Sequence, residues 1–150
     1  MPCYITSTGF YLPGRAVEND DIERYLGSFP DEAEIKKTVL AMNGIVSRHY
    51  AQDEHQQPTE DVYAMAAKAV ESCLESADAG VPITFLSAGT TFAPLAGPGL
   101  ASIIHPKVAH LSRLNRPVEI SSHSGICTSA AAAFVSAARA INCGFNREFE

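Results

Sequence analysis

The sequence is poor in charge and has no tryptophan: of its 150 residues, 19% are charged and 46% are hydrophobic. This balance excludes intrinsic disorder, which needs low hydrophobicity and high charge. A net charge of −6 argues against a nucleic-acid-binding domain, whose surface would be basic. No uninterrupted apolar run approaches the roughly 20 residues of a membrane-spanning helix, and residues 1–4 lack the basic start of a signal peptide. We therefore expect a cytoplasmic globular protein whose length, taken alone, suits a single domain.

Closely spaced cysteines are also missing. The four cysteines, Cys3, Cys73, Cys127 and Cys143, form no Cys-x-x-Cys pair, so we predict no metal site. The chain is long enough to fold without disulfides, and we expect the thiols to be reduced. Cys73 and Cys143 lie in apolar helical patterns and are most simply buried small hydrophobic residues.

Acidic residues are nearly absent from the second half. Residues 1–78 hold 14 acidic and 6 basic residues, a net charge of −8, whereas residues 79–150 hold 3 acidic and 5 basic residues, a net charge of +2. No acidic residue occurs between Asp78 and Glu119. The two halves should therefore present different surfaces, and an acidic partner would approach the second one. A solvated helix face is the simpler explanation of Lys107, Arg113 and Arg116.

Predicted strands alternate with predicted helices along the chain. β-favouring residues predict strands at 3–11, 45–51, 83–90 and 118–122. Apolar periodicity predicts a short helix capped by Asn19 or Asp20, a second ended by Gly44, and others at 60–79, around Pro106, and at 128–143. This alternation predicts an α/β fold with a largely parallel sheet. The helix at 128–143 is apolar all round, so we expect it to be buried on every side.

The stretch between Glu119 and Arg139 contains no Asp, Glu, Lys or Arg, and Cys127 stands in its middle. The pattern places Cys127 after a buried strand and at the start of a buried helix. There the helix dipole favours a thiolate, and free backbone N–H groups could hold an oxyanion. A buried structural cysteine remains an equal alternative. A serine-hydrolase turn is disfavoured because Gly125-Ile126-Cys127-Thr128-Ser129 lacks the second glycine, and His123 is a weak candidate for a base acting on Cys127.

Several segments, in order and spacing, resemble the β-ketoacyl-acyl-carrier-protein synthase III family of the thiolase-like superfamily. They are Ile5-Thr6-Ser7-Thr8-Gly9-Phe10-Tyr11-Leu12-Pro13, Asn19-Asp20-Asp21-Ile22, Asn43-Gly44-Ile45-Val46-Ser47-Arg48-His49, residues 64–79, Gly89-Thr90-Thr91 with Pro98, and Cys127 at the head of a central helix. The resemblance implies a layered α-β-α-β-α subunit. Residues 1–150 would be its N-terminal half, with a mostly parallel mixed sheet and a buried central helix, and the last core strand of that half would be absent.

The resemblance also implies a function. Cys127 would accept an acyl group from acyl-CoA or an acyl carrier and pass it to malonyl-acyl carrier protein with loss of carbon dioxide. Coenzyme A would serve as a substrate thioester, so no cofactor is expected. The matching positions make Asn43, Arg48, Thr91 and Gly97 candidate substrate-binding residues. The His and Asn that the family also uses lie in its C-terminal half, and the full subunit would form a homodimer.

Three departures from the family pattern are visible. The family's adenine-binding Trp has no counterpart here, and Met42 stands where an Arg is common. Gly97 replaces a bulky aromatic that helps to close the neighbouring acyl pocket, so we predict a roomier pocket. A two-residue excess around residues 122–126 suits a specialised, secondary-metabolic relative.

Two other functions stay open. One is a non-decarboxylating acyltransferase on the same fold, and the other is a non-catalytic half-chain or partner subunit. For residues 1–150 alone we expect no turnover and poor solubility, because the central helix would be left uncovered.

Overall fold

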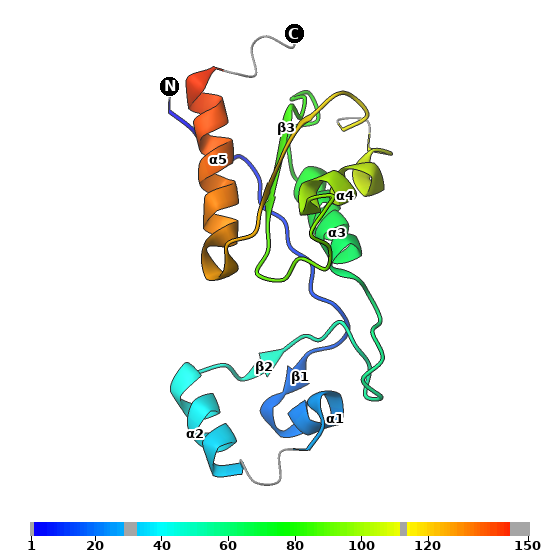
Figure 1. Cartoon of the computed structure of the whole chain (residues 1–150), viewed down its shortest axis with the longest axis vertical. Helices are drawn as coiled ribbons and strands as arrows, with labels where there is room; N and C mark the ends of the chain where they lie inside the picture. The colour runs from blue at the N-terminus through cyan, green and yellow to red at the C-terminus, as the bar shows by residue number, and fades with distance from the viewer. Residues whose placement is uncertain (1, 29–32, 112–113, 145–150) are drawn as a thin grey trace. The chain divides into compact units, whose positions relative to one another are not determined.

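The computed structural model describes residues 2–28, 33–111 and 114–144. The chain divides into two compact units, of which unit 1 comprises Met1–Tyr11 with Ala66–Glu150 and unit 2 comprises Leu12–Met65. Figure 1 shows the elements of both units, and each unit is described by itself below. Arg113, which we expected on a solvated helix face, and residues 145–150 at the end of the chain lie outside the described residues.

Unit 1 is built on a pair of parallel strands. Strand β3 (Phe85–Gly89) pairs with β4 (Glu119–His123), with Phe85 opposite Glu119 and Gly89 opposite His123. Both strands were predicted from the sequence, with bounds that differ by one or two residues. The continuous apolar run that predicted β3 is typical of a parallel strand with both faces covered.

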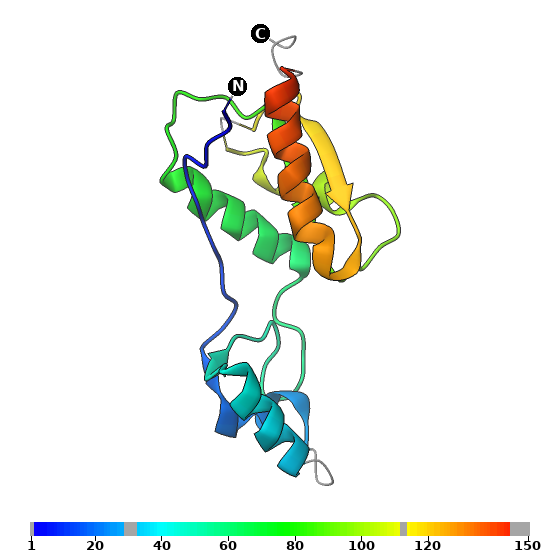
Figure 2. The same ribbon diagram turned by 90° about the vertical axis from the view of Figure 1, so that its left-hand side faces the viewer.

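Helices α4 (Leu100–Val108) and α5 (Ser129–Cys143) cover opposite faces of this sheet (Figure 2). Ser122 Oγ accepts a 2.9 Å hydrogen bond from the backbone N–H of Ala101, at the start of α4. Gly89, paired with His123, lies against the backbone of Ser129 at the start of α5. Because successive strand residues point to opposite faces, Ser122 and His123 mark the α4 face and the α5 face respectively. Pro106 lies inside α4 without dividing it into two helices.

Helix α3 (Val62–Glu75) is the long helix predicted at 60–79, and its start is capped by Asp61, whose Oδ1 accepts the N–H of Ala64 at 2.6 Å. The predicted strand at 3–11 is wrong, since no strand is assigned there. Instead this segment lies along α3: the hydroxyl of Ser7 donates to the carbonyl of Cys73 at 2.7 Å, and Gly9 touches the backbone of α3. These contacts with a helix take the place of a strand partner.

Helix α5 is not buried on every side within residues 1–150, which agrees with the expectation that this part of the chain alone leaves the helix uncovered. Only Ser129 and Ala133 of the helix are buried, and the exposed fractions of Phe134 and Ile141 are 59% and 48%. The reason is that β3 and β4 cover only one side of α5 within the described residues. The segment Ile126–Cys143 is long and apolar enough to cross a membrane by length and composition, a test that the core helix of a soluble fold also passes.

Unit 2 is small and held by a short antiparallel pair, β1 (Val17–Glu18) with β2 (Ser47–Arg48). A 3-10 turn (Asn19–Asp21) leads directly into α1 (Ile22–Leu26), and α2 (Ala33–Asn43) follows. The predicted cap at Asn19 or Asp20 is therefore wrong, because those residues form the 3-10 turn and Asp21 precedes the helix. The strand predicted at 45–51 shortens to β2. Gly44, with φ of +67°, follows the end of α2 as predicted.

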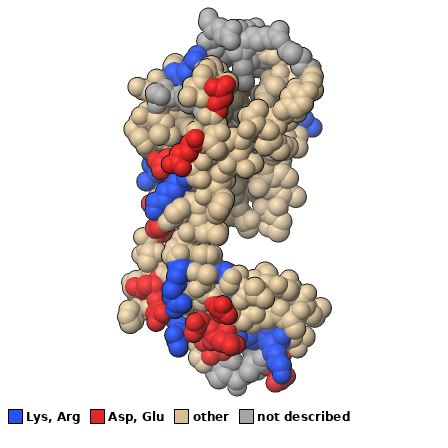
Figure 3. All heavy atoms as spheres, turned by 180° about the vertical axis from the view of Figure 1, so that it is seen from behind, with Lys and Arg blue, Asp and Glu red and all other residues tan. Residues whose placement is uncertain are grey.

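The sheet is thus smaller than the sequence predicted. The α/β class is confirmed, but the strands of the described residues form two separate pairs, one parallel and one antiparallel, instead of one mixed sheet. Charge also differs between the units. In the view of Figure 3 unit 2 carries basic beside acidic side chains, whereas unit 1 carries charges of both signs mainly along one side and shows neither over a broad part of its face. Some acidic side chains of unit 2 form ion pairs, such as Glu54 with Arg15 and Glu23 with Lys36, both at 2.9 Å.

Candidate active site

Cys127 lies in a tight 3-10 turn (Ile126–Thr128) between β4 and α5, and its side chain is exposed. The strand-turn-helix context predicted for Cys127 is therefore present. An exposed thiol does not fit the alternative of a buried structural cysteine. Cys143 is also exposed and Cys73 is half-buried, so the expectation that these two are buried is wrong. Cys143 is exposed because it lies on the side of α5 that the strands do not cover.

The turn has an unusual backbone. Ile126, directly before Cys127, has a φ of +52°, a region that β-branched residues rarely adopt. Ser129 is 1% exposed, and its Oγ accepts the N–H of Gly125 at 2.7 Å and donates to the carbonyl of Ile126 at 2.8 Å. Thr128 Oγ1 donates to the carbonyl of Gly125 at 2.9 Å. The turn that presents Cys127 is thus fixed by the hydroxyls of the two residues after this cysteine, which bond the backbone of the two residues before it.

Thr91 is brought to the same turn. It lies in the loop after β3, and its Oγ1 donates to the carbonyl of Ile126 at 3.2 Å. We predicted Thr91 as a substrate-binding residue, but in this structure its hydroxyl bonds the protein backbone. Substrate binding by Thr91 therefore stays a prediction. Gly97 lies in the same loop, and a Cβ built on it would meet no atom within 4 Å.

The loop after β3 and the end of β4 enclose a cavity of about 360 Å³. Its lining mixes small apolar side chains with hydroxyls, namely Thr90, Ala93, Leu95, Ala96, Gly99, Leu100, Ser122, His123 and Ser124. The ring Nε2 of His123 lies 2.8 Å from the hydroxyl of Ser121. The hydrogen bonds of the described residues give this ring no contact with the Cys127 thiol, so its role as a base finds no support.

The other two candidate residues, Asn43 and Arg48, belong to unit 2. The side-chain oxygen of Asn43 accepts the N–H of Ile45 at 2.8 Å, and Arg48 donates to the carbonyl of Val17 at 3.5 Å. Both therefore hold the backbone of unit 2. Their predicted part in substrate binding stays a prediction.

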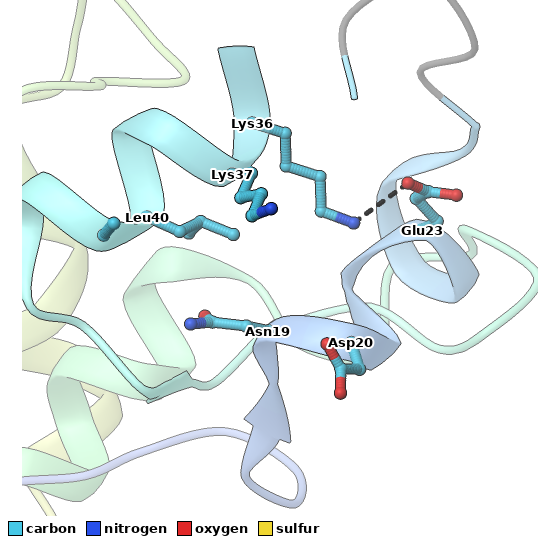
Figure 4. A pocket seen from close by; sticks show the side chains of 7 residues that line it. Asn19, Asp20, Glu23, Lys36, Lys37 and Leu40 are labelled. Atoms are coloured by element: carbon cyan, nitrogen blue, oxygen red, sulfur yellow. Dashed lines mark hydrogen bonds and ion pairs between the residues drawn. The ribbon is translucent and has the colours of Figure 1, made fainter. Parts of the chain in front are cut away.

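Sequence reasoning missed a second cavity, of about 460 Å³, between α2 and the 3-10 turn of unit 2. Figure 4 shows Lys37 and Leu40 of α2 and Asn19 of the turn directed toward the same space. The side-chain oxygen of Asn19 is buried without a hydrogen-bond partner, while its nitrogen donates to the carbonyl of Ile45 at 3.0 Å. The adjacent Lys36-Lys37 pair was the only signal in the sequence. Within the described part of the chain no group of three or more His, Cys, Asp or Glu side chains is placed to hold a metal ion.

Comparison with known proteins shows which proteins have a similar sequence and fold. No protein-family profile matches the sequence. Over 108 residues the chain is 31% identical to a β-ketoacyl-[acyl-carrier-protein] synthase III of Caulobacter vibrioides, an alignment that covers 72% of this chain and 30% of that protein. The structure superimposes on AbyA1, a tetronic acid condensing enzyme, with a TM-score of 0.67 and 22% identity over 93% of this chain and 40% of that one.

The chain thus spans less than half the length of either protein. The structural match shows a thiolase-like fold, and the sequence match points to the family. Together with the strand-turn-helix that presents Cys127, they show that the chain resembles one part of the β-ketoacyl-acyl-carrier-protein synthase III-like condensing enzymes.

Proposed function

We propose that the protein carrying this chain is an acyl-thioester condensing enzyme in which Cys127 is the acyl acceptor. The observation that carries the proposal is the exposed thiol of Cys127, in a fixed turn at the start of α5, in a chain that resembles this family. The acyl group would come from acyl-CoA or an acyl carrier. It would then pass to malonyl-acyl carrier protein with decarboxylation.

The chemistry divides into two steps. The thiolate of Cys127 attacks the thioester carbonyl, and collapse of the tetrahedral intermediate expels the donor thiolate, which takes up the proton that Cys127 lost. Loss of carbon dioxide from the malonyl group then leaves an enolate, whose carbon attacks the acyl-cysteine and releases the Cys127 thiolate. Splitting the reaction in this way replaces one difficult transfer by two easier ones.

The start of α5 suits the first step. A backbone N–H at this position could donate to the oxyanion of the tetrahedral intermediate, and the helix dipole has its positive end there. The hydrogen bonds of the described residues leave the N–H of Cys127 without a protein acceptor.

Substrate recognition is proposed from the family positions. Thr91 and Gly97 belong to the loop that follows β3, and Asn43 and Arg48 belong to unit 2. The open space at Gly97 supports a roomier acyl pocket than an aromatic residue would leave. Acyl-CoA and an acyl carrier protein are the proposed partners, in a homodimer of the full-length subunit.

A product assay tests the proposal. The full-length protein is incubated with acyl-CoA and malonyl-acyl carrier protein, and 3-oxoacyl carrier protein and carbon dioxide are measured. We expect both products from the wild type and neither from Cys127→Ala. Formation of an ester or amide product without carbon dioxide would instead support the non-decarboxylating acyltransferase. Equal 3-oxoacyl product from Cys127→Ala would refute the role of Cys127.

A further inference from the structure

The carbonyl oxygen of Ile126 is the most heavily hydrogen-bonded atom in the turn before α5. It accepts the hydroxyl of Ser129 at 2.8 Å and the hydroxyl of Thr91 at 3.2 Å, and it also accepts the backbone N–H of Ser129. These donors come from two different elements, the first turn of α5 and the loop after β3. The carbonyl is therefore fixed in direction.

Fixing this carbonyl also fixes the N–H of Cys127. The two groups belong to one planar trans peptide, in which C=O and N–H point in opposite directions. With the carbonyl held by Ser129 and Thr91, the N–H of Cys127 is directed away from those hydroxyls. It has no acceptor in the backbone hydrogen bonds of the described residues, so it is free to donate to a bound substrate.

The backbone conformation needs this support. Ile126 has a φ of +52°, which is unfavourable for a β-branched residue and persists only where the surroundings impose it. Ser129 sits at 1% exposure with one hydroxyl that bonds Gly125 and Ile126. Removing that hydroxyl would leave the N–H of Gly125 without its acceptor and free the carbonyl of Ile126 on one side.

We propose that Ser129 and Thr91 are positioning residues that aim the N–H of Cys127 at the thioester oxygen. The proposal rests on the proposed function of Cys127. As the sulfur of Cys127 bonds to the thioester carbon, the carbonyl electron pair moves to oxygen, and the aimed N–H donates to that oxyanion. When the oxyanion collapses, the bond to the donor sulfur breaks, and the donor thiolate takes the proton that Cys127 gave up. Thr91 thus acts through the backbone of Ile126.

The test compares two reactions of the same thiol in the full-length protein. Acylation by acyl-CoA passes through an oxyanion, whereas alkylation by iodoacetamide does not. In Ser129→Ala and Thr91→Val we expect the acylation rate of Cys127 to fall about ten-fold or more, with the alkylation rate changed by less than about three-fold. Thr91→Ser keeps the donor and should restore acylation. Ser76→Ala is the control and should keep the wild-type acylation rate, because its hydroxyl bonds the carbonyl of Cys73 in α3 instead of the turn.

Equal losses in both reactions, or no loss of acylation, would overturn the proposal. A second measurement is independent of catalysis: a crystal structure of the Ser129→Ala, Thr91→Val double variant should show φ of Ile126 moved to a negative value. An unchanged positive φ would also overturn it. If the wild type forms no acyl adduct, the proposed function fails, and φ of Ile126 still decides the positioning. If Ser129→Ala does not fold, the comparison of Thr91→Val with Thr91→Ser decides it.

Discussion

A Cβ atom placed on Gly89 would overlap the backbone oxygen of Ser129, closer than any real contact allows. The end of β3 and the first turn of α5 therefore touch through their backbones. This contact sets the depth at which α5, and with it the turn of Cys127, lies on the sheet. Only glycine at position 89 permits it.

The first prediction concerns this contact. Gly89→Ala should destabilise unit 1 by about 1–3 kcal/mol, because the backbone of α5 must move away from the sheet. It should also slow acylation of Cys127. Urea unfolding checks the stability. Gly80→Ala is the control, since a Cβ there lies 3.4 Å from the nearest atom, and it should change stability by less than about 0.5 kcal/mol. Equal stability of the two variants would show that the contact is unimportant.

The second prediction concerns acyl chain length. Gly97→Phe should lower kcat/KM for a long-chain acyl donor about ten-fold and leave that for acetyl-CoA nearly unchanged, because the aromatic ring fills the space beside Gly97. Competition between acetyl-CoA and a long-chain acyl-CoA measures the ratio. Strict acetyl preference in the wild type would contradict the roomier pocket, as would an unchanged ratio in the variant. Gly97→Ala serves as the control and should keep the wild-type ratio.

The third prediction concerns Asp53 in unit 2. The backbone N–H of Gln57, at 3.0 Å, and that of His55, at 2.8 Å, donate to its carboxylate and lower the pKa of Asp53 below its ordinary value of 3.8. Because the pKa is lower in the folded state, the ionised carboxylate stabilises the fold at pH values above the ordinary pKa. This stabilisation is lost as the pH falls through the lowered pKa of the folded state. The amide resonances of His55 and Gln57 should therefore shift with a midpoint at a pH below the pKa of a free aspartate. Asp53→Asn should abolish the shift; a titration at or above the ordinary value would contradict the prediction.

The sequence predicted the elements that depend on local signals. The apolar run at β3, the short β-favouring segment at β4 and the periodicity of α3 were each visible in the sequence, and the structure confirms these three elements. The predicted strand at 3–11 failed because a strand also needs a partner, and the described residues give this segment a helix instead.

The candidate site was predicted only in part, because local patterns again could be read from the sequence and long-range contacts could not. The strand-turn-helix around Cys127 follows from local patterns, so its position could be predicted. The contacts of Ser129 and Thr91 with Ile126 could not, because a serine within a run of small residues gives no signal and Thr91 is 35 residues away from Ile126 in sequence. The apolar composition of α5 predicted burial but could not say what covers the helix, and only the family resemblance led to the expectation that residues 1–150 alone leave it uncovered.

The central claim is that Cys127 accepts the acyl group, and mass spectrometry of the acylated protein tests it most directly. The full-length protein is incubated with acyl-CoA, digested, and each cysteine peptide is examined for an acyl thioester. Cys3 and Cys143 are exposed thiols in the same chain and serve as internal controls. The proposal predicts an acyl group on Cys127 and none on the other two. An adduct spread equally over the exposed cysteines, or absent from Cys127, would contradict it.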